Sequence, residues 1–159
     1  MNYLIQFVAA LVASVCFCVM FSVPKRQYFI CGLLGGISWI IYYLLADASG
    51  VIIATFCAMA VIVLLARLLA PMRKCPVTIL MIPGFIPLAP GSFIYYTAYY
   101  VVQKDFENVL HYGLLTLGVA LAIVLAIIII FALPIKPLAK RIAVLVKGKE
   151  KQKTDKTEE

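Results

Sequence analysis

The stretch PVTILMIPGFIPLAPGSFIYYTAYY, residues 76–100, is apolar enough to enter a membrane but cannot form one uninterrupted helix. Five residues that disturb a helix lie inside it: Pro83, Gly84, Pro87, Pro90 and Gly91. Each proline lacks a backbone N–H, and the glycines add backbone freedom. The uncharged run around them extends over residues 77–103, so we expect a break near the bilayer midplane. The alternative is a purely structural proline kink, but the clustering of the five residues favours a real break.

Four further uncharged runs flank this stretch, and a helix needs about 20 such residues to cross a bilayer. They cover residues 3–22, 28–46, 51–66 and 109–133. The third run reaches full length if the Arg67 side chain snorkels to the membrane surface. The chain is also 65% hydrophobic and only 13% charged, which is too apolar for a small water-soluble domain. We therefore predict an all-α integral membrane protein with five transmembrane helices, the fourth broken by the Pro/Gly-rich segment.

The basic residues between these runs predict the orientation of the chain. Cytoplasmic loops of membrane proteins carry an excess of Lys and Arg. If the carboxy terminus is cytoplasmic and all five runs cross, Lys104 is the one basic side chain left outside, beside Asp105 and Glu107. We therefore expect a multi-pass protein of the bacterial inner membrane with its amino terminus outside. The net charge of +7 follows from this pattern, so we expect contact with the lipid bilayer and no binding of nucleic acid.

Two segments are expected beyond the transmembrane domain, which we assign to residues 1–135. Residues 136–148 combine apolar side chains such as Leu138 with basic ones such as Lys140, which predicts an interfacial amphipathic segment. Residues 149–159 contain no apolar side chain, which predicts a disordered cytoplasmic tail.

Small residues recur within the runs at the spacing that lets helices approach closely in lipid. Gly32 and Gly36 lie one turn apart in the second run, and Gly118, Ala122 and Ala126 form a similar stripe in the fifth. These stripes predict packed neighbouring helices, either within this chain or in a partner.

Patterns typical of catalysis or metal binding are missing from the sequence. It has no nucleophile with a paired base, no carboxylate pair and no His/Cys cluster, so we expect neither an enzyme nor a metal or other cofactor. Cys16 and Cys18 are two residues apart, and on a helix they point to nearly opposite faces. We expect the cysteines to be reduced and buried as small hydrophobic residues.

Three sequence elements resemble the small subunit of the split threonine/serine exporter family. They are SVPKR at residues 22–26, CGLLGGISWIIYYLL at residues 31–45 and PVTILMIPGFIPLAPG at residues 76–91, with Tyr95 after them. The last element is the most specific, because it combines a Pro-x-Thr start with PG, PL and PG. Tyr96 departs from the pattern, since the family often has a basic residue there. The resemblance fades near Leu125.

The resemblance implies export of small amino acids such as threonine and serine, driven by the proton gradient and carried out with a larger membrane subunit. None of the five runs has a charged side chain near its centre, and proton-coupled carriers usually need one. This fits a chain that is half of a transporter. Export of a small dicarboxylate such as succinate, or a non-transporting scaffold or assembly role, is the alternative.

The residues after Pro90 suggest a site for the carboxylate of the substrate. Ser92 is a good N-cap for a helix from Phe93 to Gln103. The first turn of such a helix has unpaired N–H groups and about half a positive charge at its tip, so it binds an anion without Lys or Arg. The alternative is that Ser92 merely caps a helix and Gly91 merely allows a turn.

Other groups in the same segment complete this hypothesis. The carbonyls freed by the prolines, those of Ile79, Pro83 and Ile86, would meet an ammonium or hydroxyl group, and the Tyr95 phenol would add a contact. The candidate substrate-binding residues are Pro83, Gly84, Pro87, Pro90, Gly91, Ser92 and Tyr95.

Overall fold

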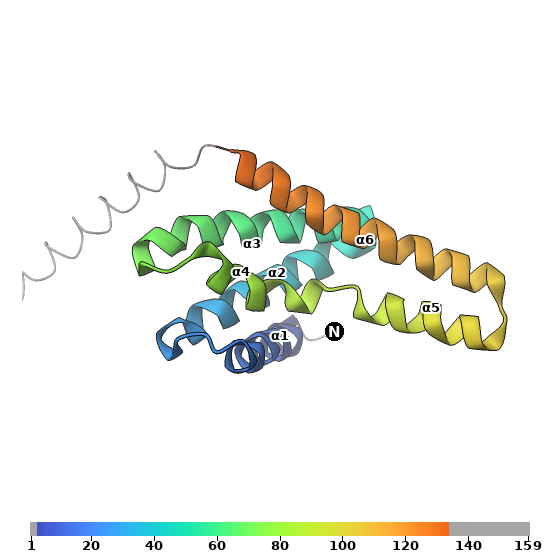
Figure 1. Cartoon of the computed structure of the whole chain (residues 1–159), viewed down its shortest axis with the longest axis horizontal. Coiled ribbons are helices and arrows are strands. Elements are labelled where there is room, and N and C mark those ends of the chain that lie inside the picture. Colours follow the sequence, from blue (N-terminus) through green and yellow to red (C-terminus); the bar gives the residue numbers. More distant parts are fainter. Residues whose placement is uncertain (1–2, 134–159) are drawn as a thin grey trace, which may run out of the picture.

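The structure, a computed structural model, describes residues 3–133, and all elements in that range are helical (Figure 1). They are α1 (Tyr3–Met20), the 3₁₀ turn η1 (Lys25–Gln27), α2 (Tyr28–Ser49), α3 (Val51–Arg73), α4 (Val77–Phe85), the 3₁₀ turn η2 (Ile86–Leu88), α5 (Gly91–Gln103) and α6 (Phe106–Ala132). The all-α prediction is confirmed. The predicted amphipathic segment 136–148 and the predicted tail 149–159 lie outside the described residues.

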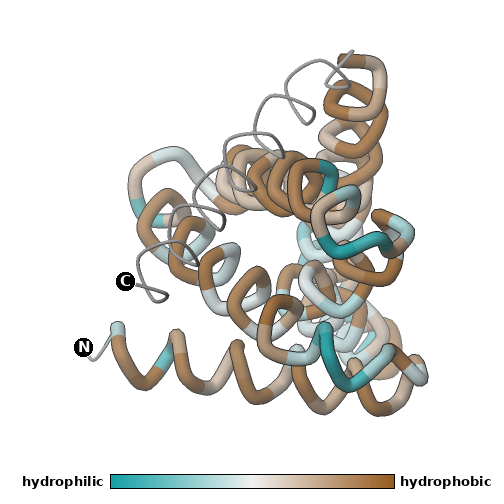
Figure 2. Tube along the Cα trace, turned by 90° about the vertical axis from the view of Figure 1, so that its left-hand side faces the viewer, coloured by the Kyte–Doolittle hydropathy of each residue, from teal (hydrophilic) through white to brown (hydrophobic). Residues whose placement is uncertain are grey.

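Four helical stretches are long and apolar enough to cross a membrane: α1, η1 with α2, α3, and α6. The stretch from α4 to the end of α5 passes the same test as a pair of helices bent by 46°, so the described residues hold five spans if this pair counts as one. Hydrophobic residues dominate along the helices, and the strongly hydrophilic residues lie mostly at the turns (Figure 2). This is the organisation of a multi-pass membrane protein.

Several helix ends differ from the predicted ones, and capping accounts for one of them. α6 begins at Phe106 instead of residue 109, because Asp105 accepts hydrogen bonds from the Asn108 backbone N–H at 3.3 Å and from its side-chain amide at 2.7 Å. α1 ends two residues earlier than predicted, and α2 continues through Asp47 to Ser49. α3 runs to Arg73, so the predicted end at residue 66 is wrong.

Arg67 lies inside α3 and binds the end of a neighbouring helix. Its guanidinium Nη1 donates to the carbonyl oxygen of Leu133 at 3.0 Å and to that of Ile130, and the guanidinium lies 5.1 Å from the centroid of the Phe131 ring. The last carbonyls of a helix lack intrahelical donors and carry partial negative charge. Arg67 therefore ties α3 to the C-terminal end of α6.

Glycines bring α1 and α2 into close contact, as their spacing predicts. A Cβ atom added at Gly36 would lie 2.6 Å from the Phe7 ring, and one at Gly32 would lie 2.8 Å from a methyl group of Val15. At Gly35 the added Cβ would meet the Ser14 hydroxyl at 1.8 Å. This face of α2 therefore accepts no side chain larger than hydrogen unless the two helices move apart.

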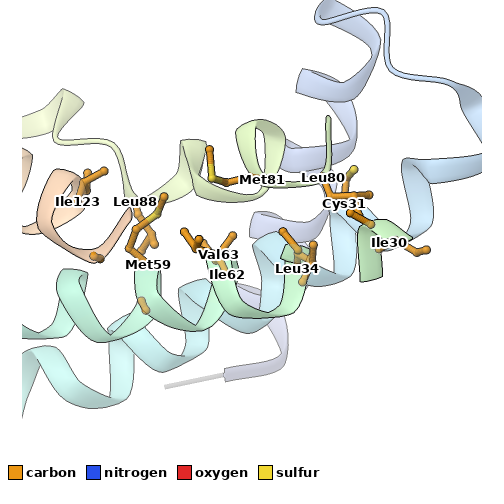
Figure 3. Close-up of a cluster of buried hydrophobic side chains, with 14 of the residues drawn as sticks. Ile30, Cys31, Leu34, Met59, Ile62, Val63, Leu80, Met81, Leu88 and Ile123 are labelled. Carbon is orange, nitrogen blue, oxygen red and sulfur yellow. The ribbon is translucent and has the colours of Figure 1, made fainter. Parts of the chain in front are cut away.

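The core lies between α2, α3 and α4, with one side closed by α6. Leu80 of α4 and Met59, Ile62 and Val63 of α3 are almost completely buried in it, together with Leu34 of α2. Figure 3 shows these side chains gathered in one cluster with Leu88 and Ile123. The first half of the bent pair is therefore part of the core.

The second half of the bent pair leaves the core. α5 has no buried residue and packs against the first half of α6, and this hairpin extends beyond the ends of α2 and α3 (Figure 1). The buried residues of α6 all lie in its second half, where α6 meets α3, and they include Ala122 and Ala126 of the predicted stripe. The packing predicted for that stripe is confirmed.

Candidate functional site

The proline-rich segment bends later than its first proline suggests. α4 continues through Pro83 to Phe85, the 3₁₀ turn η2 follows, and the chain becomes extended at Ala89 before α5 begins at Gly91. A proline inside a helix removes one N–H···O=C bond and is tolerated when another donor replaces it. The break therefore covers residues 86–90.

Two of the three carbonyls expected to be free for a substrate already have donors. The carbonyl of Ile79 receives no backbone hydrogen bond from Pro83, because proline has no N–H. The Cys31 thiol of α2 approaches this carbonyl oxygen at 3.6 Å instead. The backbone N–H of Ala89 donates to the carbonyl of Ile86 at 3.0 Å, because the chain tightens there into a 3₁₀ turn. The prediction is wrong for these two groups. Pro87, four residues after Pro83, has no N–H to donate to the Pro83 carbonyl.

The α2 residues that contact backbone carbonyls of α4 were not identified from the sequence. Besides Cys31, the Ser38 hydroxyl donates to the carbonyl oxygen of Gly35 in its own helix at 2.8 Å and makes a longer contact of 3.4 Å with that of Gly84, so α2 contacts carbonyls of α4 at two levels. Cys31 and Ser38 are seven residues apart, which places them on one helix face. That spacing was the available signal, but it points to α4 only once the two helices are known to pack together.

The seven predicted site residues fall into two environments. Pro83 and Gly84 are buried in the core, and Pro87 is half-buried. Pro90 is also half-buried. Gly91, Ser92 and Tyr95, which follow it, are exposed on the surface of the described chain. The structure therefore keeps the seven residues close along the chain without gathering their side chains around one cavity.

Ser92 lies inside the first turn of α5 and does not cap it. The N-cap is Pro90, no side chain caps this helix, and the helix begins at Gly91, two residues earlier than expected. The Gly91 N–H donates to the carbonyl of Ala89 at 2.8 Å, and the Ile94 N–H donates to that of Pro90 at 3.1 Å. The N–H groups of Ser92 and Phe93 are left without an acceptor in residues 3–133.

The space around this helix start is open. A Cβ atom added at Gly91 would meet nothing within 4 Å, and the backbone of Gly91 is not in the left-handed region. The chain itself therefore gives no steric reason for glycine at this position. The first turn of α5 can be approached closely by a ligand or by another protein, and its two unpaired N–H groups favour an acceptor or an anion.

Tyr95 belongs to a series of stacked tyrosines between α5 and α6. Its ring centroid lies 5.6 Å from that of Tyr96 and 6.2 Å from that of Tyr99. The rings of Tyr96 and Tyr100 lie 5.2 Å and 5.4 Å from that of Tyr112 on α6. The Tyr95 side chain is 63% exposed, so its phenol remains available at the edge of this series.

The cysteines differ in burial. Cys16 is exposed and Cys18 is buried, which confirms that the two point to different faces of α1. Cys31 is also buried, whereas Cys57 and Cys75 are only half-buried, and the expectation of burial is wrong for Cys16, which is exposed. Within residues 3–133 no three His, Cys, Asp or Glu side chains come together in a way that could hold a metal ion.

Comparison with known proteins identifies the family. The model of the threonine/serine exporter family matches residues 6–133, which includes all helices from α2 to α6 and nearly all of α1. No curated protein and no solved structure matches the chain. The chain belongs to the threonine/serine exporter family and is a membrane component of a transporter.

Proposed function

We propose that this member of the threonine/serine exporter family is the small membrane subunit of a secondary transporter. Together with a larger membrane subunit it exports small amino acids of the threonine/serine type across the bacterial inner membrane. The observation that supports this best is the bend of 46° between η2 and α5, where a helix start with unpaired N–H groups lies open. Discontinuous helices of this kind bind substrates in secondary transporters.

The first turn of α5 is the proposed site for the carboxylate of the amino acid. The N–H groups of Ser92 and Phe93 are free in the described residues, and Gly91 leaves the backbone accessible. An anion at this position is stabilised by these donors and by the helix dipole. The Tyr95 phenol, on the same exposed side, supplies a further polar contact. Pro87 lies in the 3₁₀ turn η2, and Pro90 follows the extended residue Ala89 directly before α5, so the chain is not a continuous α-helix here.

A larger subunit is part of the proposal because an exposed break cannot face lipid. Hydrocarbon offers no partner for free backbone N–H groups, so protein or a watery cavity must cover them. Among residues 3–133, α5 packs mainly on α6, and none of its side chains is buried. The larger subunit, in this proposal, covers the break and supplies the ionisable group for coupling to the proton gradient.

The basic residues, with Lys25 and Arg73 among them, favour a cytoplasmic carboxy terminus.

The test is the substitution Gly91→Val in cells that produce both subunits. Export of radiolabelled threonine and serine should be abolished, because the valine side chain blocks approach to the free N–H groups. The chain should still insert and assemble, since the added atoms meet nothing in this chain. Ser92→Ala should reduce export less, because its backbone donor remains.

Gly113→Val is the matched control, because a Cβ atom there also has room, with Thr97 Cγ2 at 3.8 Å, but lies away from the break. Normal export by an assembled Gly91→Val variant would refute the site. Export of succinate in place of amino acids by the wild-type pair would indicate the dicarboxylate function. Full export with the bend removed would indicate that this chain is only a scaffold.

A further inference from the structure

A pocket of about 170 Å³ lies between the turn after α1 and the first turns of α4. Residues 21–23 line it on one side, and Thr78, Ile79, Ile82 and Pro83 line it on the other. The two stretches that form it belong to the sequence elements SVPKR and PVTILMIPG, which are far apart in the chain. The pocket is separate from the first turn of α5, since none of its lining residues follows Pro83.

The turn after α1 has an unusual residue at its centre. The N–H of Val23 donates to the carbonyl of Cys18 at 3.0 Å and the N–H of Ser22 to that of Val19 at 3.1 Å, which is the pattern of a Schellman cap. The capping position with positive φ is normally glycine, yet Ser22 occupies it with φ 52°. Serine is therefore less favourable here than glycine for the turn alone, and this serine lines the pocket.

The polar groups of the pocket suit a small zwitterion. Ser22 and Thr78 both line the pocket, and both side chains are exposed at the surface of the described chain, so their hydroxyls are accessible to a ligand. Ile79 also lines the pocket, but its carbonyl oxygen already has the Cys31 thiol at 3.6 Å. A hydroxyl donates one hydrogen bond and accepts others, so the two accessible hydroxyls are suitable partners for a carboxylate and an ammonium group.

Positive charge surrounds the same end of the molecule. Lys25 and Arg26 follow the turn that forms one wall, and Arg73 and Lys74 precede the helix that forms the other. The turn into α2 and the turn between α3 and α4 lie at one end of the helix bundle (Figure 1). No Asp or Glu lies in these two turns, so the local field attracts an anionic group.

The size of the pocket and its walls restrict what it can hold. A volume of about 170 Å³ accommodates several water molecules or a small metabolite, and the pocket is partly open to the surface, so a ligand can enter it. The remaining lining side chains, those of Phe21, Val23, Ile82 and Pro83, are apolar. They exclude additional charged groups and leave room for a short side chain.

We propose that this pocket, called the entry pocket, is where the amino acid first binds from the cytoplasm, before it reaches the break at Gly91. The inference rests on the proposed function and adds a second binding position to it. The hydroxyls of Ser22 and Thr78 bind the polar groups of the amino acid, and Ile82 limits the length of its side chain.

The test measures transport in inside-out membrane vesicles from cells that produce the whole transporter, with radiolabelled threonine as the probe. Thr78→Val keeps the shape of the side chain and removes its hydroxyl, so KM should rise about fivefold while the rate at saturation is unchanged. Thr97→Val is the matched control: its hydroxyl already donates to the carbonyl of Phe93 at 2.7 Å, and its KM should not change.

Ser22→Gly separates a structural role from a binding role. Glycine relieves the left-handed strain, so thermal stability in detergent should rise, whereas KM for threonine should rise as well because the hydroxyl is lost. A purely structural Ser22 would give higher stability with an unchanged KM.

Ile82→Ala tests the pocket by a gain of function that misfolding cannot imitate. The enlarged pocket should admit leucine, measured as new uptake of radiolabelled leucine into the vesicles. Ile94→Ala in α5 is the control and should not admit it. The entry pocket is refuted if wild-type vesicles transport threonine but Thr78→Val and Ser22→Gly leave KM unchanged and Ile82→Ala admits no leucine. Wild-type vesicles that transport neither threonine nor serine would refute the proposed function itself, and the entry pocket with it.

Discussion

α4 and α5 are the two halves of one bent segment, yet they have opposite surroundings. α4 buries Leu80, Met81, Pro83 and Gly84 between α2 and α3, whereas α5 buries nothing. Both halves contain helix-disrupting residues, and both lose backbone hydrogen bonds. In α4 the side chains of α2 supply substitute donors, and in α5 the free groups have no partner within the described chain.

The comparison shows that a proline-rich sequence does not by itself mark a binding site. Where neighbouring helices satisfy the lost hydrogen bonds, as at Pro83, the irregular backbone is part of the core. Where the neighbours do not, as at Gly91, the same chemistry is left for a substrate or another protein. The backbone groups of the exposed half therefore need a partner outside this chain, either a substrate or another protein.

The largest expected effect compares one glycine from each half. A Cβ at Gly84 would already touch Leu34 at 3.4 Å and Ile62 at 3.5 Å, so the further methyl groups of Gly84→Val have no space. We expect a loss of about 3 kcal/mol and a strong drop in the amount of folded protein. Gly91→Val should leave stability nearly unchanged, because nothing lies within 4 Å.

Both variants are compared by the temperature at which the detergent-solubilised protein aggregates, followed by size-exclusion chromatography. Equal stability of the two variants would contradict the difference in packing between α4, which is buried in the core, and α5, which is exposed.

A smaller effect is expected where α2 supports the proline of α4. Cys31→Ala removes the group that approaches the carbonyl of Ile79, and a buried acceptor without a donor costs about 1–2 kcal/mol. Cys31→Ser keeps a donor of similar size, so it should retain more of the stability than alanine does. Thermal aggregation of the two variants gives the comparison, with Cys16→Ala on the exposed face of α1 as the unaffected reference. The idea fails if serine and alanine are equally destabilising.

The smallest effect concerns the turn at the far end of the hairpin. Hydrogen bonds from the Asn108 side chain and backbone hold the pKa of the Asp105 carboxyl below its ordinary value. A carboxyl with a lowered pKa in the folded state stabilises the protein above its ordinary pKa of about 4, and this contribution disappears as the pH falls through the lowered value. Asp105→Ala should therefore be slightly less stable than wild type at pH 7.

The same measurement at several acidic pH values checks the sign. The difference between wild type and Asp105→Ala should shrink as the carboxylate is protonated. Asp105→Asn, which keeps a capping oxygen, should lie between them at pH 7 and show little dependence on pH. A difference that grows on acidification would contradict the capping role.

The sequence predicted some features of the helix packing and of the bent segment correctly and missed others. Gly32 and Gly36 correctly indicated close packing in lipid, and the proline cluster correctly indicated that no straight helix covers residues 77–103. The exact start of the break was missed, because Pro83 is tolerated inside α4 by a thiol from another helix. The prediction that Ser92 caps α5 was wrong, because residues that can cap a helix are common and the helix begins two residues earlier, with Pro90 as its N-cap.

Composition and spacing were enough for the helical class, the membrane environment and the family, because each follows from runs of apolar residues and from short motifs within one segment. Tertiary structure alone decided which freed backbone groups are satisfied and which remain open, and it brought Ser22 and Thr78 together at one pocket. The physical reason is that hydrophobicity is a property of each residue, whereas a hydrogen bond or a pocket requires two segments at a particular distance. Helix packing sets that distance, and no single stretch of the sequence contains it.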